Sequence, residues 1–215
     1  CVLPRVPVTI DGHRALATIQ RSWYARWHPV SLLMAPLGWL YGAAMYFRAI
    51  LYRWGLLHSV ELPVPVVVVG NVTVGGTGKT PLVGAIVEQL RASGRRPGIV
   101  TRGYGGSATH WPQQVGPSSD PHLVGDESVM LVRQTGQPVV AGPDRVAGAR
   151  ALINDYGCDV VVSDDGLQHL RLRRTVEIVV LDGERRFGNG RVLPAGPLRE
   201  WPGRLRDVDL VLQRD

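Results

Sequence analysis

Residues 73 to 80 combine the side chains and the backbone freedom that binding of nucleotide phosphates requires. Glycines recur there and let the backbone curl, so that successive N–H groups point at phosphate oxygens. Lys79 supplies an ammonium group for the β- and γ-phosphates, and the Thr80 hydroxyl is suited to coordinating Mg²⁺. The segment therefore predicts an ATP–Mg²⁺ site formed by Thr73, Val74, Gly75, Gly76, Thr77, Gly78, Lys79 and Thr80.

Lys79 is the only lysine among 24 basic residues, so all the others are arginines. A planar guanidinium cannot replace a flexible ammonium in a tight phosphate cradle, which gives a reason for lysine to persist at this position. Chance survival in an arginine-rich composition is the alternative. The formal net charge of +6 favours anionic partners, namely phosphates, nucleic acid or an anionic membrane face, without choosing among them.

Carboxylates that bind the metal are expected at the end of a strand beside this loop. Asp164 and Asp165 follow the apolar run 160–163 and precede Gly166. Asp182 follows another apolar run, 177–181, and is interpreted as a structural turn residue. Because carboxylate oxygens are preferred ligands of Mg²⁺, Asp164 and Asp165 are the predicted metal pair. Which of the two contacts the metal directly stays open.

Short apolar strands alternate with amphipathic helices in the region 63–215. This alternation is typical of an α/β fold of the P-loop NTPase kind, with a mostly parallel sheet and helices on both faces. The stretch 103–121 is rich in Gly, Pro and Ser and is interpreted as a mobile loop. Strands are predicted at 66–69, 98–101, 139–141, 159–163, 177–181 and 208–212, and helices at 79–93, 126–135 and 145–156.

An uncharged apolar run occupies residues 30–47, within an N-terminal segment that we take as 1–62. Aromatic and arginine residues flank the run, which is typical of a membrane interface. We expect an interfacial hairpin or helix that dips into one leaflet. A transmembrane helix and a helix packed on the protein's own core are the alternatives. Residues 61–65 are interpreted as a stiff linker to the predicted P-loop core, 63–215.

Five segments resemble, in order and spacing, the tetraacyldisaccharide 4'-kinase family of lipid A biosynthesis. The likeness extends from about residue 22 to residue 212 and corresponds to the N-terminal two-thirds of the family pattern. Thr73 stands where a P-loop usually has its first glycine, and this family tolerates a hydroxyl residue there. The segments are GNVTVGGTGKTP (70–81), TRGYG (101–105), VGDE (124–127), DDGLQH (164–169) and LPAGPLRE (193–200).

The resemblance implies transfer of the ATP γ-phosphate to the 4'-hydroxyl of a tetraacylated glucosamine disaccharide 1-phosphate. Such an acylated substrate implies that the enzyme works at a membrane surface, here the cytoplasmic face of the bacterial inner membrane. By similarity, Asp126 is the general base that accepts the proton of the sugar hydroxyl. The other active-site residues that the resemblance implies are Lys79, Tyr104, Arg145, Gln168, His169, Arg199 and Glu200.

Structural interpretations compete with these roles. Asp126 is alternatively a cap of the helix that starts there. His169 is alternatively a satisfied core histidine, and Arg145 a surface residue in the first turn of a helix. Glu200 is alternatively a solvated charge. A further arginine cluster lies outside the five motifs and is interpreted as a solvated face or an anionic-lipid contact: Arg171, Arg173 and Arg174.

Two other functions compete with the lipid kinase. One is a P-loop ATPase or GTPase of the metal-chaperone type, and the other is a truncated, membrane-attached ATP-binding protein without turnover. The second is a real alternative because the family pattern continues past Asp215 into a C-terminal lobe; on that alternative the chain binds ATP with little or no turnover. Dispersed basic residues without an aromatic platform predict no nucleic-acid partner. The sequence does not indicate an oligomeric state.

Overall fold

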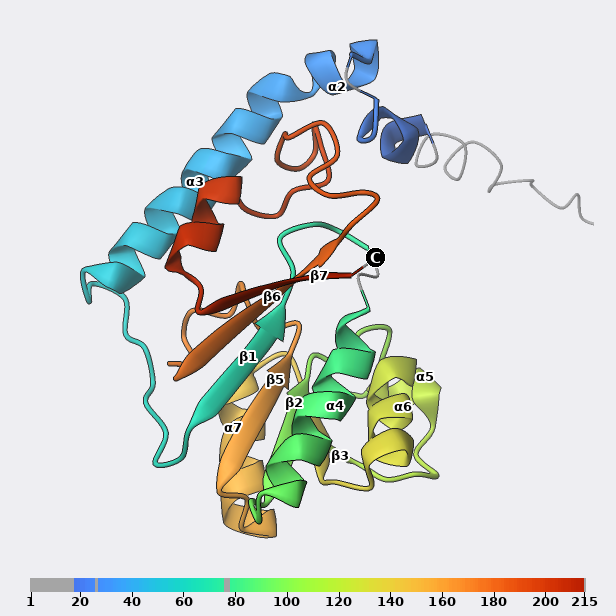
Figure 1. The fold of residues 1–215 in the computed structure, drawn as a ribbon, viewed down its shortest axis with the longest axis vertical. Helices are drawn as coiled ribbons and strands as arrows, with labels where there is room; N and C mark the ends of the chain where they lie inside the picture. Colours follow the sequence, from blue (N-terminus) through green and yellow to red (C-terminus); the bar gives the residue numbers. More distant parts are fainter. Residues whose placement is uncertain (1–17, 26, 76–77, 215) are drawn as a thin grey trace, which may run out of the picture.

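A seven-stranded sheet forms the centre of the computed structural model, which describes residues 18–25, 27–75 and 78–214 (Figure 1). The strand order is β3-β4-β2-β5-β1-β6-β7, and every neighbouring pair is parallel except β3 and β4. This arrangement confirms the predicted mostly parallel sheet. The strands are β1 (Val66–Gly70), β2 (Pro97–Thr101), β3 (Gln113–Val115), β4 (Val139–Ala141), β5 (Val160–Asp164), β6 (Val176–Asp182) and β7 (Leu210–Arg214).

β3 was missed by the sequence prediction, because it lies within the stretch 103–121 that we interpreted as a mobile loop. It has three residues and pairs antiparallel with β4 at the edge of the sheet, where only Val115 is buried. An edge strand of this kind has no continuous apolar run, so the pattern that identifies buried parallel strands does not reveal it.

Valine-rich strands bury side chains on both faces of the sheet, and a different set of helices covers each face. Successive residues of a strand point to opposite faces, and β1 shows the consequence. Val69 packs in the cluster with α4 and α6, whereas Val66 and Val68 pack in the cluster with α7. The predicted helices on both faces are therefore confirmed. They are α4 (Lys79–Ala92), α6 (Asp126–Thr135) and α7 (Arg145–Tyr156), and the structure adds the short α5 (Pro121–Val124), which was not predicted.

The apolar run near the N-terminus forms α2 (Pro29–Leu33) and α3 (Ala35–Arg53), with α3 lying along the outside of the molecule (Figure 1). Two buried glycines let α3 approach the core. A Cβ added at Gly38 would lie 3.0 Å from the Val192 carbonyl oxygen, and one at Gly42 would lie 2.6 Å from the Trp201 indole nitrogen. α3 is thus one continuous helix packed on the protein, and none of the described helices combines the length and hydropathy needed to cross a bilayer.

Replacing Gly42 by leucine is expected to loosen α3 from the core, because its side chain would overlap the Trp201 indole. Hydrogen exchange measured by mass spectrometry should then accelerate in α3 while the sheet stays protected. Ala43→Leu is the matched control, since Ala43 is exposed on the same helix. Equal exchange in the two variants would contradict this packing.

Candidate nucleotide-binding site

The predicted phosphate cradle lies between the carboxyl end of β1 and the start of α4. A parallel sheet collects its ligands at this edge, and the N-terminus of a helix favours anions. The loop is anchored by the Val74 amide, which donates to the Pro197 carbonyl (2.8 Å), and by the Asn71 side-chain amide, which donates to the Gly75 carbonyl (3.2 Å). Thr80 lies in the first turn of α4. The predicted residues Gly76 and Thr77 lie outside the described part of the chain.

Gly78 ends the loop in a conformation that favours glycine. Its φ is +75°, in the left-handed region. A Cβ there would also lie 2.5 Å from a guanidinium nitrogen of Arg214, which extends from the end of β7 across the loop. The positive φ thus gives glycine a local reason at this position, and the Arg214 side chain, which is flexible, adds to the cradle an arginine that the sequence analysis did not single out.

Asp165 joins the cradle to the neighbouring strand. It follows β5, which pairs with β1 so that Val69 and Asp164 are register partners. Lys79 Nζ lies 3.5 Å from the Asp165 carboxylate, and Arg199 Nη1 lies 2.9 Å from each of its oxygens. Burial alone would raise the pKa of Asp165, but Lys79 and Arg199 outweigh it and hold the pKa below its ordinary value. Asp165 is therefore an ionised group shared by two cations.

Asp164 has a different environment from its neighbour. Its carboxyl is buried, and Oδ1 has no hydrogen-bond partner among the described residues. Burial raises the pKa of Asp164 to about 6, against the lowering effect of Lys79, while the Glu127 charge raises it further. An unpartnered buried carboxylate oxygen beside the phosphate cradle fits a hard cation such as Mg²⁺. Among the described residues, no group of three or more His, Cys, Asp or Glu side chains is placed so that it could hold a metal ion.

In metal-free buffer, Asp164→Asn is expected to stabilise the chain at pH 8, by at most about 3 kcal/mol. The pKa of Asp164 in the folded chain is about 6 and exceeds the ordinary value of 3.8, so folding favours the protonated form. The stability of the unsubstituted chain therefore rises as the pH falls from about 6 towards 4, and the advantage of the asparagine variant shrinks over that window. Thermal unfolding at pH 8 and pH 4 measures the difference, and an equal difference at both would contradict the prediction.

Arg199, Gln168 and Glu200 extend this cluster away from the cradle. Arg199 Nη1 donates to Gln168 Oε1 (3.2 Å), and Gln168 Nε2 donates to Glu200 Oε1 (2.8 Å). Gln168 Nε2 also contacts the carbonyl of Asn71, the residue that anchors the loop (3.3 Å). The structure thus connects five of the predicted site residues, which are Lys79, Asp165, Arg199, Gln168 and Glu200. The side chain of Glu200 is 12% exposed, so its interpretation as a solvated charge was wrong.

Arg145 contacts the backbone at the same edge of the sheet, where β5 ends. It begins α7 but is only 2% exposed, so its interpretation as a surface residue was wrong. Its guanidinium donates to the backbone carbonyls of Gly142 (2.6 Å) and Asp164 (3.3 Å). Burial lowers the pKa of Arg145 to about 10, although Asp165 and Asp164 oppose that shift. The side chain therefore fixes the backbone from which the two aspartates extend.

A sequence profile of the family described as tetraacyldisaccharide-1-P 4'-kinase matches residues 30–215 of this chain. The chain belongs to this family. It is 56% identical over 194 residues to the tetraacyldisaccharide 4'-kinase of Nitrosococcus oceani, covering 90% of this chain and 57% of the relative. It is 60% identical over 179 residues to that of Alkalilimnicola ehrlichii, covering 83% and 54%. The chain therefore spans little more than half the length of these relatives.

The fold agrees with a solved structure of the same family. The crystal structure of LpxK from Aquifex aeolicus in complex with ATP superposes with a TM-score of 0.78 at 32% sequence identity. The match covers 86% of this chain and 58% of the LpxK chain. The architecture of this kinase family thus accounts for most of the described fold.

Three residues that the kinase resemblance implies lie apart from the connected set. Tyr104 is 74% exposed, and Asp126 is exposed at the start of α6, where its carboxylate accepts from the Glu127 amide (2.9 Å). His169 is half-buried; burial lowers its pKa, and its Nδ1 has no partner among the described residues, so it is not a satisfied core histidine. In the described part of the chain, no hydrogen bond or ion pair links these three side chains to Lys79 or Asp165. Their catalytic roles stay predictions.

Asp182 and the arginine cluster lie outside the five sequence motifs. Asp182 is a turn residue as predicted, because its carboxylate accepts from the amides of Glu184 (3.1 Å) and Arg185 (2.9 Å). The interpretation of the arginine cluster as a solvated face was wrong for Arg174, whose guanidinium lies in a buried ion pair with Glu177 (2.6 Å). The sequence offered no signal for this pair, since an exposed arginine and a buried one look alike in an arginine-rich stretch.

Proposed function

We propose that this chain is the ATP-binding part of a kinase that phosphorylates the 4'-hydroxyl of a tetraacylated glucosamine disaccharide 1-phosphate in lipid A biosynthesis. The observation that carries the proposal is the contact of Lys79 and Arg199 with one carboxylate, Asp165, at the mouth of a P-loop. Two cations beside the cradle can neutralise a transferring phosphoryl group, and the family membership favours a sugar hydroxyl as acceptor.

In this proposal the residues divide the work of phosphoryl transfer, which needs positioning and charge neutralisation more than covalent chemistry. The loop amides and Lys79 hold the phosphates of ATP, and Arg199 balances the charge that spreads over the γ-phosphoryl oxygens. Thr80, Asp164 and Asp165 would hold Mg²⁺, which neutralises phosphate charge when bound. Asp126 orients the acceptor hydroxyl and takes its proton.

The exposed face of α3 supports a membrane surface as the place of the reaction. The side chains on the face turned away from Gly38 and Gly42 are large and apolar, which is unusual for a water-exposed helix. Exposing an acylated substrate to water is unfavourable by roughly 0.8 kcal/mol for each CH₂ group, so the enzyme has to meet the lipid at the bilayer. We place the chain at the cytoplasmic face of the inner membrane. The exposed large apolar side chains of α2, α3 and the following turn are Leu32, Leu33, Leu37, Trp39, Leu40, Tyr46, Phe47, Trp54, Leu56 and Leu57.

The kinase proposal is tested with purified chain, detergent micelles, Mg²⁺, γ-labelled ATP and the tetraacylated disaccharide 1-phosphate. Label is expected in the lipid, and Lys79→Ala is expected to abolish it because the phosphates lose their ammonium contact. Arg206→Ala is the matched control, since Arg206 is an exposed basic residue. Binding of ATP that depends on Lys79 without any lipid label would contradict lipid phosphorylation by this chain and favour an ATP-binding protein without turnover.

Membrane attachment is tested separately by sedimentation with vesicles that contain anionic phospholipid. The double variant Leu40→Asp/Phe47→Asp is expected to lose most vesicle binding, because two charges would enter the apolar face of α3. Met130→Asp serves as the control, since Met130 is an exposed apolar residue on α6. Unchanged sedimentation of the double variant would contradict the membrane face.

A further inference from the structure

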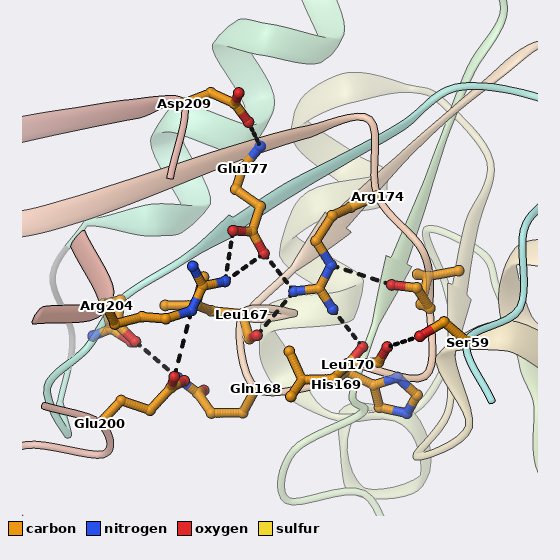
Figure 2. Close-up of polar contacts among 12 residues, drawn as sticks. Ser59, Leu167, Gln168, His169, Leu170, Arg174, Glu177, Glu200, Arg204 and Asp209 are labelled. Carbon is orange, nitrogen blue, oxygen red and sulfur yellow. Dashed lines mark hydrogen bonds and ion pairs between the residues drawn. The ribbon is translucent and has the colours of Figure 1, made fainter. Parts of the chain in front are cut away.

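A buried carboxylate at the start of β6 holds two arginines from different parts of the chain (Figure 2). The side chain of Glu177 is 8% exposed and accepts from Arg174 Nη1 at 2.6 Å. Arg204, from the 3-10 helix η1 (Pro202–Asp207), reaches both oxygens of the same carboxylate through Nη2, at 2.7 and 2.5 Å. Two of its nitrogens have separate partners, since Nη2 contacts Glu177 and Nε lies 3.5 Å from Glu200, and this restricts the direction of the guanidinium. Arg204 is therefore held in a fixed orientation.

The other edge of the Arg204 guanidinium faces the candidate nucleotide site. Its Nε lies 3.5 Å from Glu200 Oε2, and Figure 2 shows Glu200 between Arg204 and Gln168. Gln168 connects Glu200 to Arg199, which contacts Asp165 and thereby Lys79. A continuous path of hydrogen bonds and ion pairs thus leads from Glu177 to the P-loop lysine.

Acidic and basic side chains alternate along this path, with the neutral Gln168 between Glu200 and Arg199. Among the described residues, Arg204 is the only cation within ion-pair distance of Glu200. Arg199 Nη1 and the Glu200 carboxylate contact the same amide, that of Gln168, from its two ends. Without Arg204, a largely buried Glu200 would lack a counter-charge, and Arg199 is the neighbouring cation that it would attract.

We infer that Arg204, oriented by Glu177, is a positioning residue that keeps Glu200 from drawing Arg199 away from Asp165. When Arg199 pairs with Asp165, this carboxylate is shared between Arg199 and Lys79, and the Lys79 ammonium can contact phosphate. With Arg199 on Glu200, Asp165 holds Lys79 alone and the cradle loses positive charge, so both changes weaken phosphate binding. The inference rests on the ATP-binding part of the proposed function, and it adds residues that lie outside the five sequence motifs.

The test measures binding of ATP in EDTA by calorimetry, so that metal binding to the aspartates does not contribute. Arg204→Met is expected to weaken ATP binding about tenfold. Arg206→Met removes the same charge from the same 3-10 helix, but Arg206 is exposed, and it is expected to bind ATP within about twofold of the unsubstituted chain. Equal affinities for the two variants would overturn the inference.

A double variant distinguishes a positioning role of Arg204 from a purely structural one. In Arg204→Met/Glu200→Gln a neutral amide replaces the competing carboxylate. Arg199 is therefore expected to return to Asp165, and ATP affinity is expected to recover to within about threefold of the unsubstituted chain. A structural role for Arg204 predicts instead that the double variant binds as weakly as Arg204→Met, or more weakly. That result would overturn the inference. Thermal unfolding of every variant establishes that binding is measured on folded protein.

If Arg204→Met does not fold, Arg204→Lys carries the test with Arg206→Lys as control, because one ammonium cannot satisfy both Glu177 and Glu200. Weaker ATP binding that Glu200→Gln restores is again the expected result, and unchanged binding overturns the inference. Failure of the unsubstituted chain to bind ATP would reject the proposed function itself, whereas normal ATP binding by the Arg204 variant that folds would reject only the role of Arg204.

Discussion

Acylation of Lys79 by an amine-specific reagent is expected to abolish ATP binding, and bound ATP is expected to protect the residue. Lys79 is the chain's only lysine, so the α-amine is the only other amine that can react. Its side chain is 12% exposed and its ammonium lies beside Asp165, where a neutral amide could form no ion pair with the carboxylate or with phosphate.

Mass spectrometry of the intact chain counts the acyl groups, and a peptide map locates them with and without ATP. Lys79→Arg is the control, because it keeps the charge but removes the reactive amine. We expect this variant to resist the reagent and still to bind ATP poorly, since a planar guanidinium does not fit the place of the ammonium. Full ATP affinity after complete modification of Lys79 would show that the cradle does not use it.

Features encoded in contiguous residues were predictable from the sequence. The valine run at 66–69 identified β1, and the glycines and Lys79 after it identified the cradle. Asp164 and Asp165 were found because buried parallel strands of one sheet end at the same edge. In each case the signal lies within about ten residues, which is the range over which strand, turn and helix preferences act.

Features that depend on distant residues were not predictable in this way. Glu177 and Arg204 are 27 residues apart, and their contact depends on how η1 lies against β6. Arg145 was open to interpretation as a surface residue because the first turn of a helix is often exposed, whereas here it lies beneath the end of β5. Which arginine is buried is decided by tertiary packing, and an arginine-rich composition gives no local sign of it.

Glu177→Leu is expected to lower the free energy of unfolding by about 3–5 kcal/mol, because it leaves Arg174 and Arg204 without their shared counter-charge. Urea unfolding followed by circular dichroism measures the change. Glu61→Leu is the matched control, since Glu61 pairs with Arg173 on the exposed surface. An exposed ion pair contributes about 1 kcal/mol or less. A similar loss of unfolding free energy in both variants would contradict the prediction that the buried Glu177 contributes more to stability than an exposed ion pair.

A triple variant, Glu177→Leu/Arg174→Leu/Arg204→Leu, separates the stability of this cluster from its effect on the nucleotide site. Replacing all members of a buried charge cluster by apolar residues is often neutral or stabilising, so we expect unfolding close to that of the unsubstituted chain. ATP binding is expected to stay weak, because Glu200 still lacks Arg204. Recovered stability together with weak ATP binding would mean that the charges are needed for the arrangement at Arg199. Recovery of both properties would mean that the cluster serves the fold alone.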